Sequence, residues 1–236
     1  MICLLTSLPV VEETDELNPA NGFIKELRRA VLRPCRALYI CSDPDCDNEY
    51  YAGFLKKSFE DADFCFSSFS ILDGRTADRA AELIGGADFI ILTGGHVPTQ
   101  NRFFERIGLR ALLRDFDGLI MGISAGSMNA AKVVYAQPEL PGEAVDPGYR
   151  RFLPGLGLTK TMIIPHYYGI KDEMLDGLRI LEEITLPDSV GRTFYFIPDG
   201  SYLYIGPGGE ELRGEAYRVK DGEITKVSSK GDVLPL

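Results

Sequence analysis

Long apolar runs, clusters of like charge and an excess of positive charge are all missing from this sequence of 236 residues. No apolar run reaches the roughly 18 residues that a membrane-spanning helix needs. No block of like charges suggests an acidic tail or a basic arm. Lys and Arg number 25 against 35 Asp and Glu, which gives a net charge of −10. Because such a surface repels nucleic acid and anionic lipid, the sequence predicts neither as a partner.

The cysteines lack the pattern of a disulfide framework or a CxxC motif, and their number is odd. They all lie in the first third of the chain, at Cys3, Cys35, Cys41, Cys46 and Cys65. We expect reduced thiols, as in a cytoplasmic protein. The N-terminal apolar run is short and has no basic residues before it, so we expect no signal peptide and a cytoplasmic location.

Short apolar runs alternate with helical patterns through the first 130 residues. This alternation is typical of successive β-α units in a parallel sheet. We expect strands at 2–5, 37–41, 64–66, 89–92 and 119–123, and helices at 22–32, 49–61, 77–84 and 100–113. The order predicts an α/β fold, a three-layer doubly wound sandwich around a mostly parallel sheet.

The second half of the chain has weaker signals. Residues 138–157 are rich in Pro and Gly and are expected to form a long loop. A strand at 162–164, a helix at about 172–184 and short strands near 193–197, 202–205, 216–219 and 223–227 should follow. Asp221-Gly222 is typical of a hairpin turn. Since no repeat or low-complexity segment appears, we expect a single domain over residues 1–236.

The segment Gly122-Ile123-Ser124-Ala125-Gly126 has the Gly-x-Ser-x-Gly pattern of a nucleophile turn between a strand and a helix. Its flanks agree, since an apolar run precedes it and a helical pattern follows. The helix N-terminus would add free amides and partial positive charge beneath an oxyanion. The alternative is that Ser124 only caps the helix.

Only two histidines could serve as a base for Ser124. His166 follows the expected strand Met162 to Ile164, and His96 follows Gly94-Gly95 after another strand. The two glycines look like a loop that supplies backbone N–H groups to an oxyanion, which leaves His166 as the better base. Acidic residues between the serine and this histidine are Glu139, Glu143 and Asp146, and their spacing does not choose among them.

Four motifs in order resemble the peptidase E family, whose relatives include cyanophycinases. They are Ile91-Leu92-Thr93-Gly94-Gly95, the Ser124 turn, Pro165-His166 and Pro198-Asp199-Gly200. The resemblance covers most of the chain and implies a class I glutamine-amidotransferase-like, flavodoxin-type sandwich. The best-known members of the family are cytoplasmic aspartyl dipeptidases.

The resemblance also assigns roles to residues. It implies Ser124 as nucleophile, His166 as general base, Glu139 as triad acid, and the amides of Gly95 and Ala125 as oxyanion hole. Asp146 matches a second acidic position of the family. The positions expected to contact substrate are Gly94, His96, Asp146 and Asp199.

This sequence departs from the family pattern at two places. His96 and Val97 follow the glycines where the family usually continues with Gly-Asn. The stretch after His166 lacks the arginine of the aspartyl dipeptidases, for which Lys171 or Arg102 would have to substitute. A strict preference for N-terminal aspartate therefore stays open.

The sequence as a whole predicts a serine peptidase that hydrolyses short peptides without metal or cofactor, as a monomer or homodimer. Two alternatives remain. An α/β-hydrolase-like esterase shares the Gly-x-Ser-x-Gly turn, although its histidine normally lies nearer the C-terminus. A noncatalytic ligand-binding or stress-response protein of the same fold would have a misaligned triad.

Overall fold

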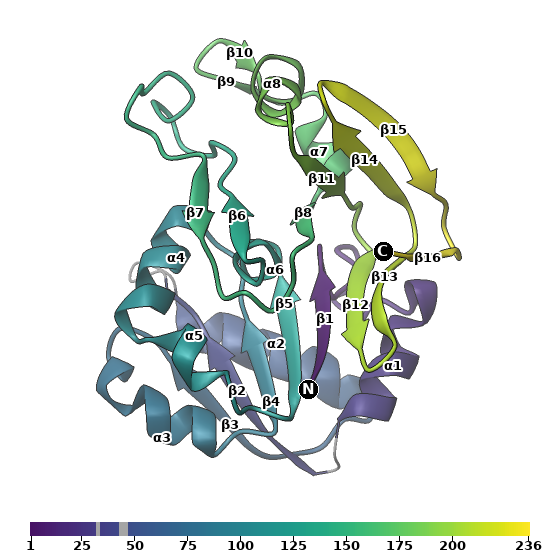
Figure 1. Ribbon diagram of the computed structural model, residues 1–236. Helices are drawn as coiled ribbons and strands as arrows, with labels where there is room; N and C mark the ends of the chain where they lie inside the picture. The colour runs from purple at the N-terminus through teal and green to yellow at the C-terminus, as the bar shows by residue number, and fades with distance from the viewer. Residues whose placement is uncertain (32–33, 43–46) are drawn as a thin grey trace.

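An eight-stranded sheet forms the centre of the computed structural model, which describes residues 1–31, 34–42 and 47–236. Its strands are β1 (Ile2–Thr6), β2 (Cys35–Ile40), β3 (Phe66–Leu72), β4 (Phe89–Leu92), β5 (Leu119–Ile123), β12 (Tyr202–Gly206), β13 (Gly209–Arg213) and β16 (Val233–Pro235). They lie in the order β16-β13-β12-β1-β5-β4-β2-β3 (Figure 1). The five strands from β1 to β3 in this order pair in parallel, and β12, β13 and β16 add antiparallel pairs. Because parallel strands share one carboxyl edge, the residues after β1, β4 and β5 come close together.

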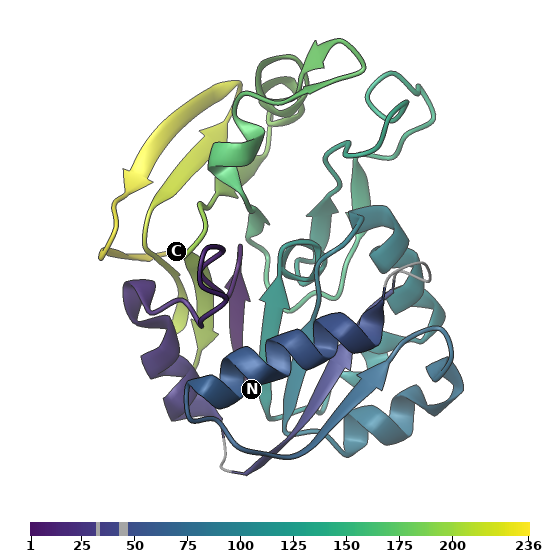
Figure 2. The ribbon, with the colours of Figure 1, turned by 180° about the vertical axis from the view of Figure 1, so that it is seen from behind.

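Helices cover both faces of this sheet. On one face lie α1 (Phe23–Ala30) and α2 (Asn48–Asp61), and on the other lie α3 (Ala80–Gly85), α4 (Val97–Arg106) and α5 (Leu109–Leu112) (Figures 1 and 2). Alternate residues of β1 enter the two cores: Leu4 packs in the cluster with Leu27 and Phe59, and Leu5 in the cluster with Phe103. This period of two is that of a strand buried on both sides. The predicted three-layer α/β architecture with a mostly parallel sheet is confirmed.

A second, four-stranded sheet lies beyond the carboxyl ends of β1 and β5 (Figure 1). Its strands are β8 (Met162–Ile164), β11 (Thr193–Phe196), β14 (Ala216–Lys220) and β15 (Glu223–Ser228), in the order β15-β14-β11-β8. Strands β8 and β11 pair in parallel and the others antiparallel. The predicted hairpin turn at Asp221-Gly222 is confirmed, with φ of 51° and 84° at the two residues. Positive φ at both positions is what a type I′ turn needs.

The helix predicted at 172–184 is wrong in its first half. The chain instead forms a small hairpin of β9 (Met174–Leu175) and β10 (Leu178–Arg179), followed by a π-helical turn (Ile180–Thr185) and α8 (Leu186–Asp188). The turn residues Asp176 and Gly177 both have positive φ, 54° and 84°. The Asp-Gly signal that located the hairpin at 221–222 therefore also operates here, and it overrides the helical spacing of the apolar residues.

Smaller differences occur at four other places. A strand was expected at 64–66, but β3 begins at Phe66 and ends at Leu72. Because β3 lies at the sheet edge and is only partly buried, its apolar pattern in the sequence is weak. The helix expected at 100–113 is broken by Gly108, whose φ is 65°. The long loop at 138–157 ends in β7 (Phe152–Pro154), which pairs with β6 (Val133–Tyr135). The helix expected at 22–32 ends at Ala30, and Val31 is extended with ψ of 123°. Leu32 and Cys46 lie outside the described residues.

Within the described ranges, no helix is long and apolar enough to cross a membrane. Of the cysteines described there, Cys3, Cys35 and Cys41 are buried and Cys65 is exposed.

The turn from β5 into α6 (Ala125–Asn129) is packed too closely for side chains at its two glycines. A Cβ on Gly122 would lie 2.8 Å from the Cα of Ser127. A Cβ on Gly126 would lie 2.2 Å from the backbone oxygen of Leu92, at the end of β4. The glycines let the helix start directly against the neighbouring strand.

We predict that Gly126→Ala lowers the free energy of unfolding by about 1–3 kcal/mol or more, because backbone must move to admit the methyl group. Gly53→Ala is the matched control, since Gly53 is an exposed α2 residue and nothing lies within 4 Å of the position that its Cβ would take. It should stay neutral or stabilise by about 0.5–1 kcal/mol. Denaturant unfolding of both variants measures the difference, and equal stabilities would contradict the tight packing.

Candidate active site

Ser124 occupies the turn between β5 and α6 in a backbone conformation that non-glycine residues rarely adopt, with φ 49° and ψ −114°. Its N–H donates to the backbone oxygen of Thr6 at 3.1 Å, which fixes the turn to β1. The Ser124 side chain makes no capping hydrogen bond to α6. The alternative in which this serine only caps the helix is therefore not what the structure shows. A strained residue at a strand-to-helix turn is typical of an exposed nucleophile.

His166 lies directly opposite this serine. Its Nε2 is 3.0 Å from Ser124 Oγ, and its Nδ1 is 2.8 Å from Asp199 Oδ1. The backbone of His166 is left-handed, with φ 57° and ψ 39°, where the chain turns from β8 into α7 (Tyr167–Ile170). One imidazole thus bridges a hydroxyl and a carboxylate, the arrangement of a catalytic triad.

The parallel pairing of β8 with β11 brings His166 and Asp199 together. Ile164 is opposite Phe196, and the N–H of Ile197 donates to the backbone oxygen of Ile164 at 2.9 Å. A proline follows each strand, and His166 and Asp199 come directly after these prolines, two and three residues past the paired positions. Both side chains therefore project from the same sheet edge.

Ser7, which follows β1, completes the arrangement and was missed by sequence reasoning. Its buried hydroxyl donates a short hydrogen bond to Asp199 Oδ1 and accepts one from the backbone N–H of His166 at 2.9 Å. Because the Ser7 hydroxyl donates to Asp199, we assign the proton of neutral His166 to Nδ1, which donates to Asp199, and Nε2 is then free to accept from Ser124. The sequence signal that could have identified Ser7 was its position, because it is a polar residue immediately after a central parallel strand.

Asp199 is held as a carboxylate. Partial burial would raise its pKa, but hydrogen bonds from His166 and Ser7 outweigh this effect and lower the pKa below the usual aspartate range. The group is therefore ionised at neutral pH and can stabilise a positively charged imidazole.

The glycine loop after β4 lies beside the nucleophile. A Cβ on Gly94 would be 3.6 Å from the Cβ of Ser124, and Gly95 has φ of 122°, which favours glycine. Ala125 begins α6, so its N–H has no partner within the helix. The structure thus brings the residues expected to form the oxyanion hole to the Ser124 turn.

Buried amide side chains connect that loop to the nucleophile helix. Gln100 Nε2 donates to the backbone oxygen of Thr93 at 2.6 Å, and Asn129 Nδ2 donates to Gln100 Oε1 at 3.0 Å. Asn101 Nδ2 donates to Asn129 Oδ1 at 2.8 Å. Gln100 and Asn129 are fully buried, so loss of any one member would leave unpaired polar groups. The network fixes the glycine loop relative to α6.

The sequence profile of peptidase family S51 matches residues 3–212. The chain belongs to peptidase family S51. This membership confirms the resemblance carried by the four motifs and makes the protein a peptidase of that family.

A crystal structure of a candidate peptidase E protein from Listeria monocytogenes EGD-e has a similar fold. The TM-score is 0.54 with 16% sequence identity, and the match covers 97% of this chain and 99% of that chain. At this identity the likeness concerns the fold. No curated protein matches the sequence.

Glu139, expected as the triad acid of this S51 protein, is not the residue on His166. Both ring nitrogens of His166 are engaged by other groups, and the Glu139 carboxylate faces the backbone N–H of Val97 at the start of α4. Burial raises the pKa of Glu139, and the charges of Glu143 and Glu173 raise it further. Spacing along a loop does not fix its direction, and this loop runs toward α4 instead of toward β8.

His96 also faces this loop. Its Nδ1 is 2.9 Å from Thr99 Oγ1, and its Nε2 is 2.9 Å from Glu143 Oε1 without the alignment of a hydrogen bond. Glu143 in turn accepts from the backbone N–H groups of Glu139 and Leu140. The imidazole is thus held between α4 and the 138–151 loop.

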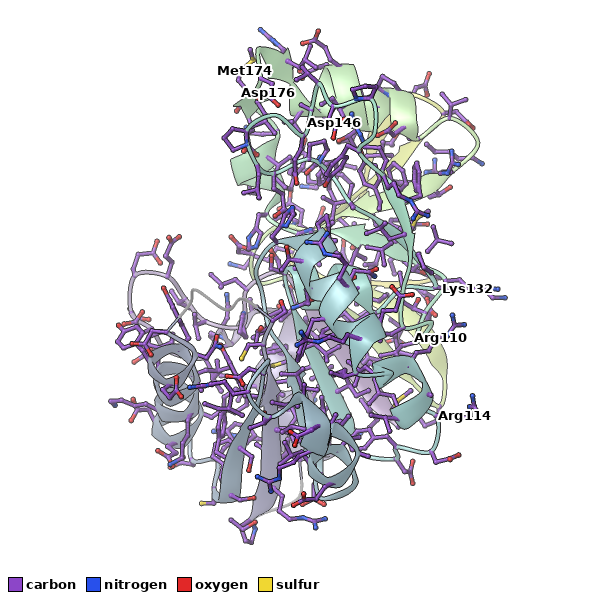
Figure 3. All side chains as sticks on the ribbon, turned by 90° about the vertical axis from the view of Figure 1, so that its left-hand side faces the viewer. Arg110, Arg114, Lys132, Asp146, Met174 and Asp176 are labelled. Carbon is purple, nitrogen blue, oxygen red and sulfur yellow. The ribbon has the colours of Figure 1, made fainter. Side chains whose placement is uncertain are left out.

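Asp146, expected at the substrate, lies far along this loop. It is exposed, accepts from the N–H of Gly148 at 2.8 Å, and lies at the same distal end of the molecule as Asp176 (Figure 3). Asp176 fastens the loop to the β9–β10 hairpin by accepting from the N–H groups of Gly142 and Ala144. Asp146 therefore shapes a turn. In the parts of the chain that the structure describes, no group of three His, Cys, Asp or Glu side chains is placed to hold a metal ion.

We predict that Asp199→Asn slows the reaction of Ser124 with a fluorophosphonate probe by about 100-fold or more, because the imidazole loses its orienting carboxylate. Glu139→Gln should stay within about threefold of the parent rate, since Glu139 does not contact His166. Labelling kinetics at neutral pH measure both. A large loss of rate in Glu139→Gln together with a small loss in Asp199→Asn would identify Glu139 as the triad acid.

Proposed function

We propose that this family S51 member is a serine peptidase with a Ser124–His166–Asp199 triad. The observation that carries the proposal is the pair of contacts at His166: 3.0 Å from Nε2 to the Ser124 hydroxyl and 2.8 Å from Nδ1 to Asp199. A serine hydroxyl is a weak nucleophile until a base at this distance accepts its proton.

The proposed reaction begins with attack of Ser124 Oγ on the scissile carbonyl carbon while His166 Nε2 takes the hydroxyl proton. The amides of Gly95 and Ala125 stabilise the oxyanion, a contribution of about 3 kcal/mol per donor in such sites. His166 then protonates the leaving amine, and the acyl-enzyme forms as the peptide bond breaks. Water, deprotonated by the same imidazole, releases the acid and restores Ser124. Asp199 stabilises the charged imidazole in both halves.

We further propose short peptides as substrates, a cytoplasmic location and a class I glutamine-amidotransferase-like arrangement of the fold. Dipeptides with N-terminal aspartate are the substrates suggested by the family resemblance. The stretch after His166 adds no support to this specificity, because Lys171 lies over the Tyr168 ring and beside Asp172. Lys171 is therefore already engaged by these two neighbours, whichever group binds an acidic substrate.

Both rival functions lose support. Family S51 membership argues against an α/β-hydrolase esterase. A noncatalytic protein would need a misaligned triad or an obstructed oxyanion loop, whereas the Ser124–His166 contact is within hydrogen-bonding distance and His96 is held by Thr99 and Glu143.

We predict that the protein hydrolyses members of a dipeptide library and that Ser124→Ala lowers kcat by about 10⁴-fold or more, because the variant lacks the attacking hydroxyl. Ser127→Ala is the control, since Ser127 is a buried serine of the same helix whose hydroxyl donates to the Thr6 backbone. Hydrolysis that survives Ser124→Ala would contradict the mechanism.

A further inference from the structure

A cavity of about 490 Å³ opens at the carboxyl edge of the central sheet, the edge that also carries the candidate active site. Its wall includes Asp73, directly after β3, and Thr99 and Arg102 of α4. Strands β2 and β3 follow β5 and β4 in the sheet order, and β4 and β5 carry the glycine loop and Ser124. The carboxyl edge of parallel strands is where such sheets bind ligands.

The two acidic residues of this cavity already share one arginine. Asp73 is 4% exposed and accepts from Arg75 Nε at 2.9 Å and from Arg75 Nη2 at 2.5 Å. A third contact, at 2.7 Å, joins Arg75 Nη1 to Glu49. One guanidinium therefore serves both carboxylates.

Two other arginines of the wall have no such partner among the described residues. Arg102 and Arg106 lie four residues apart on α4, on one face of the helix. Arg106 stacks at 5.0 Å over the Phe103 ring, and Arg102 Nη2 donates to Thr99 Oγ1 at 3.0 Å. Neither forms an ion pair with any residue in the described ranges. In a protein with a net charge of −10, two such guanidinium groups facing one cavity form a local anion-attracting site.

Hydrogen bonds through Thr99 connect Arg102 to the glycine loop after β4. Thr99 Oγ1 is 3.0 Å from Arg102 Nη2 and 2.9 Å from His96 Nδ1. His96 directly follows Gly95. A ligand group bound by Arg102 would thus lie close to the loop beside Ser124.

We propose that this cavity is an anion subsite in which Arg102 and Arg106 bind a carboxylate of the peptide substrate. The proposal rests on the proposed peptidase function for the identity of the ligand, but the anion site itself does not. Planar guanidinium groups match carboxylates with paired hydrogen bonds, which a lysine does not reproduce. The carboxylate is either the C-terminal group or an acidic side chain of the peptide.

The anion site is tested first by titrating malonate into Ser124→Ala protein in a calorimeter. We expect Arg102→Gln/Arg106→Gln to raise the Kd for malonate at least tenfold. Arg218→Gln, which removes an exposed arginine of β14, should leave the Kd unchanged. Equal binding to all forms, or no binding to the parent protein, would overturn the anion site whatever the enzyme cleaves.

The substrate role is tested with peptides that differ in one carboxylate: a dipeptide against its C-terminal amide, and an Asp-containing dipeptide against its Asn analogue. In one of the two pairs, Arg102→Gln/Arg106→Gln should lower kcat/KM at least tenfold more for the acid than for the neutral partner, and that pair identifies the carboxylate. Equal losses in both pairs would overturn the substrate role. Malonate binding that needs the arginines, in a protein that cleaves no peptide, would instead contradict the proposed function.

Discussion

Parallel pairing of β8 with β11 is the constraint on which the site depends. It places His166 and Asp199 beyond one edge of the second sheet, while β5 and β1 of the central sheet supply Ser124 and Ser7. The triad therefore spans two sheets, and the hydrogen bonds of His166 with Ser7 and Ser124 link them. Because each catalytic contact tolerates little displacement, the packing between the sheets matters as much as the residues themselves.

Close backbone approach at the nucleophile serves the same purpose within the central sheet. Glycines on either side of Ser124 let α6 begin against β4, and the amide network of Gln100 and Asn129 ties the helix to the glycine loop. Positive φ at Ser124 and His166 is sustained by hydrogen bonds to Thr6 and Ser7. Strain of this kind is kept only where the surroundings hold it.

The sequence predicted those features that depend on local patterns. Apolar runs located the parallel strands, and the glycine spacing located Ser124. It failed where function depends on contacts between distant segments: Asp199 lies 33 residues beyond His166, and only the strand pairing shows that they meet. Spacing within one loop pointed to Glu139 instead. Ser7 could be recognised only by its position after a strand. The turn at Asp176-Gly177 was missed because the apolar residues around it have helical spacing.

Nitrogen NMR of ¹⁵N-histidine-labelled protein tests the triad most directly, because only two histidines contribute signals. Neutral His166 should carry its proton on Nδ1, leaving Nε2 to accept from Ser124, and Asp199→Asn should move this signal while that of His96 stays in place. A proton on Nε2 of neutral His166, or a signal indifferent to Asp199→Asn, would contradict the triad.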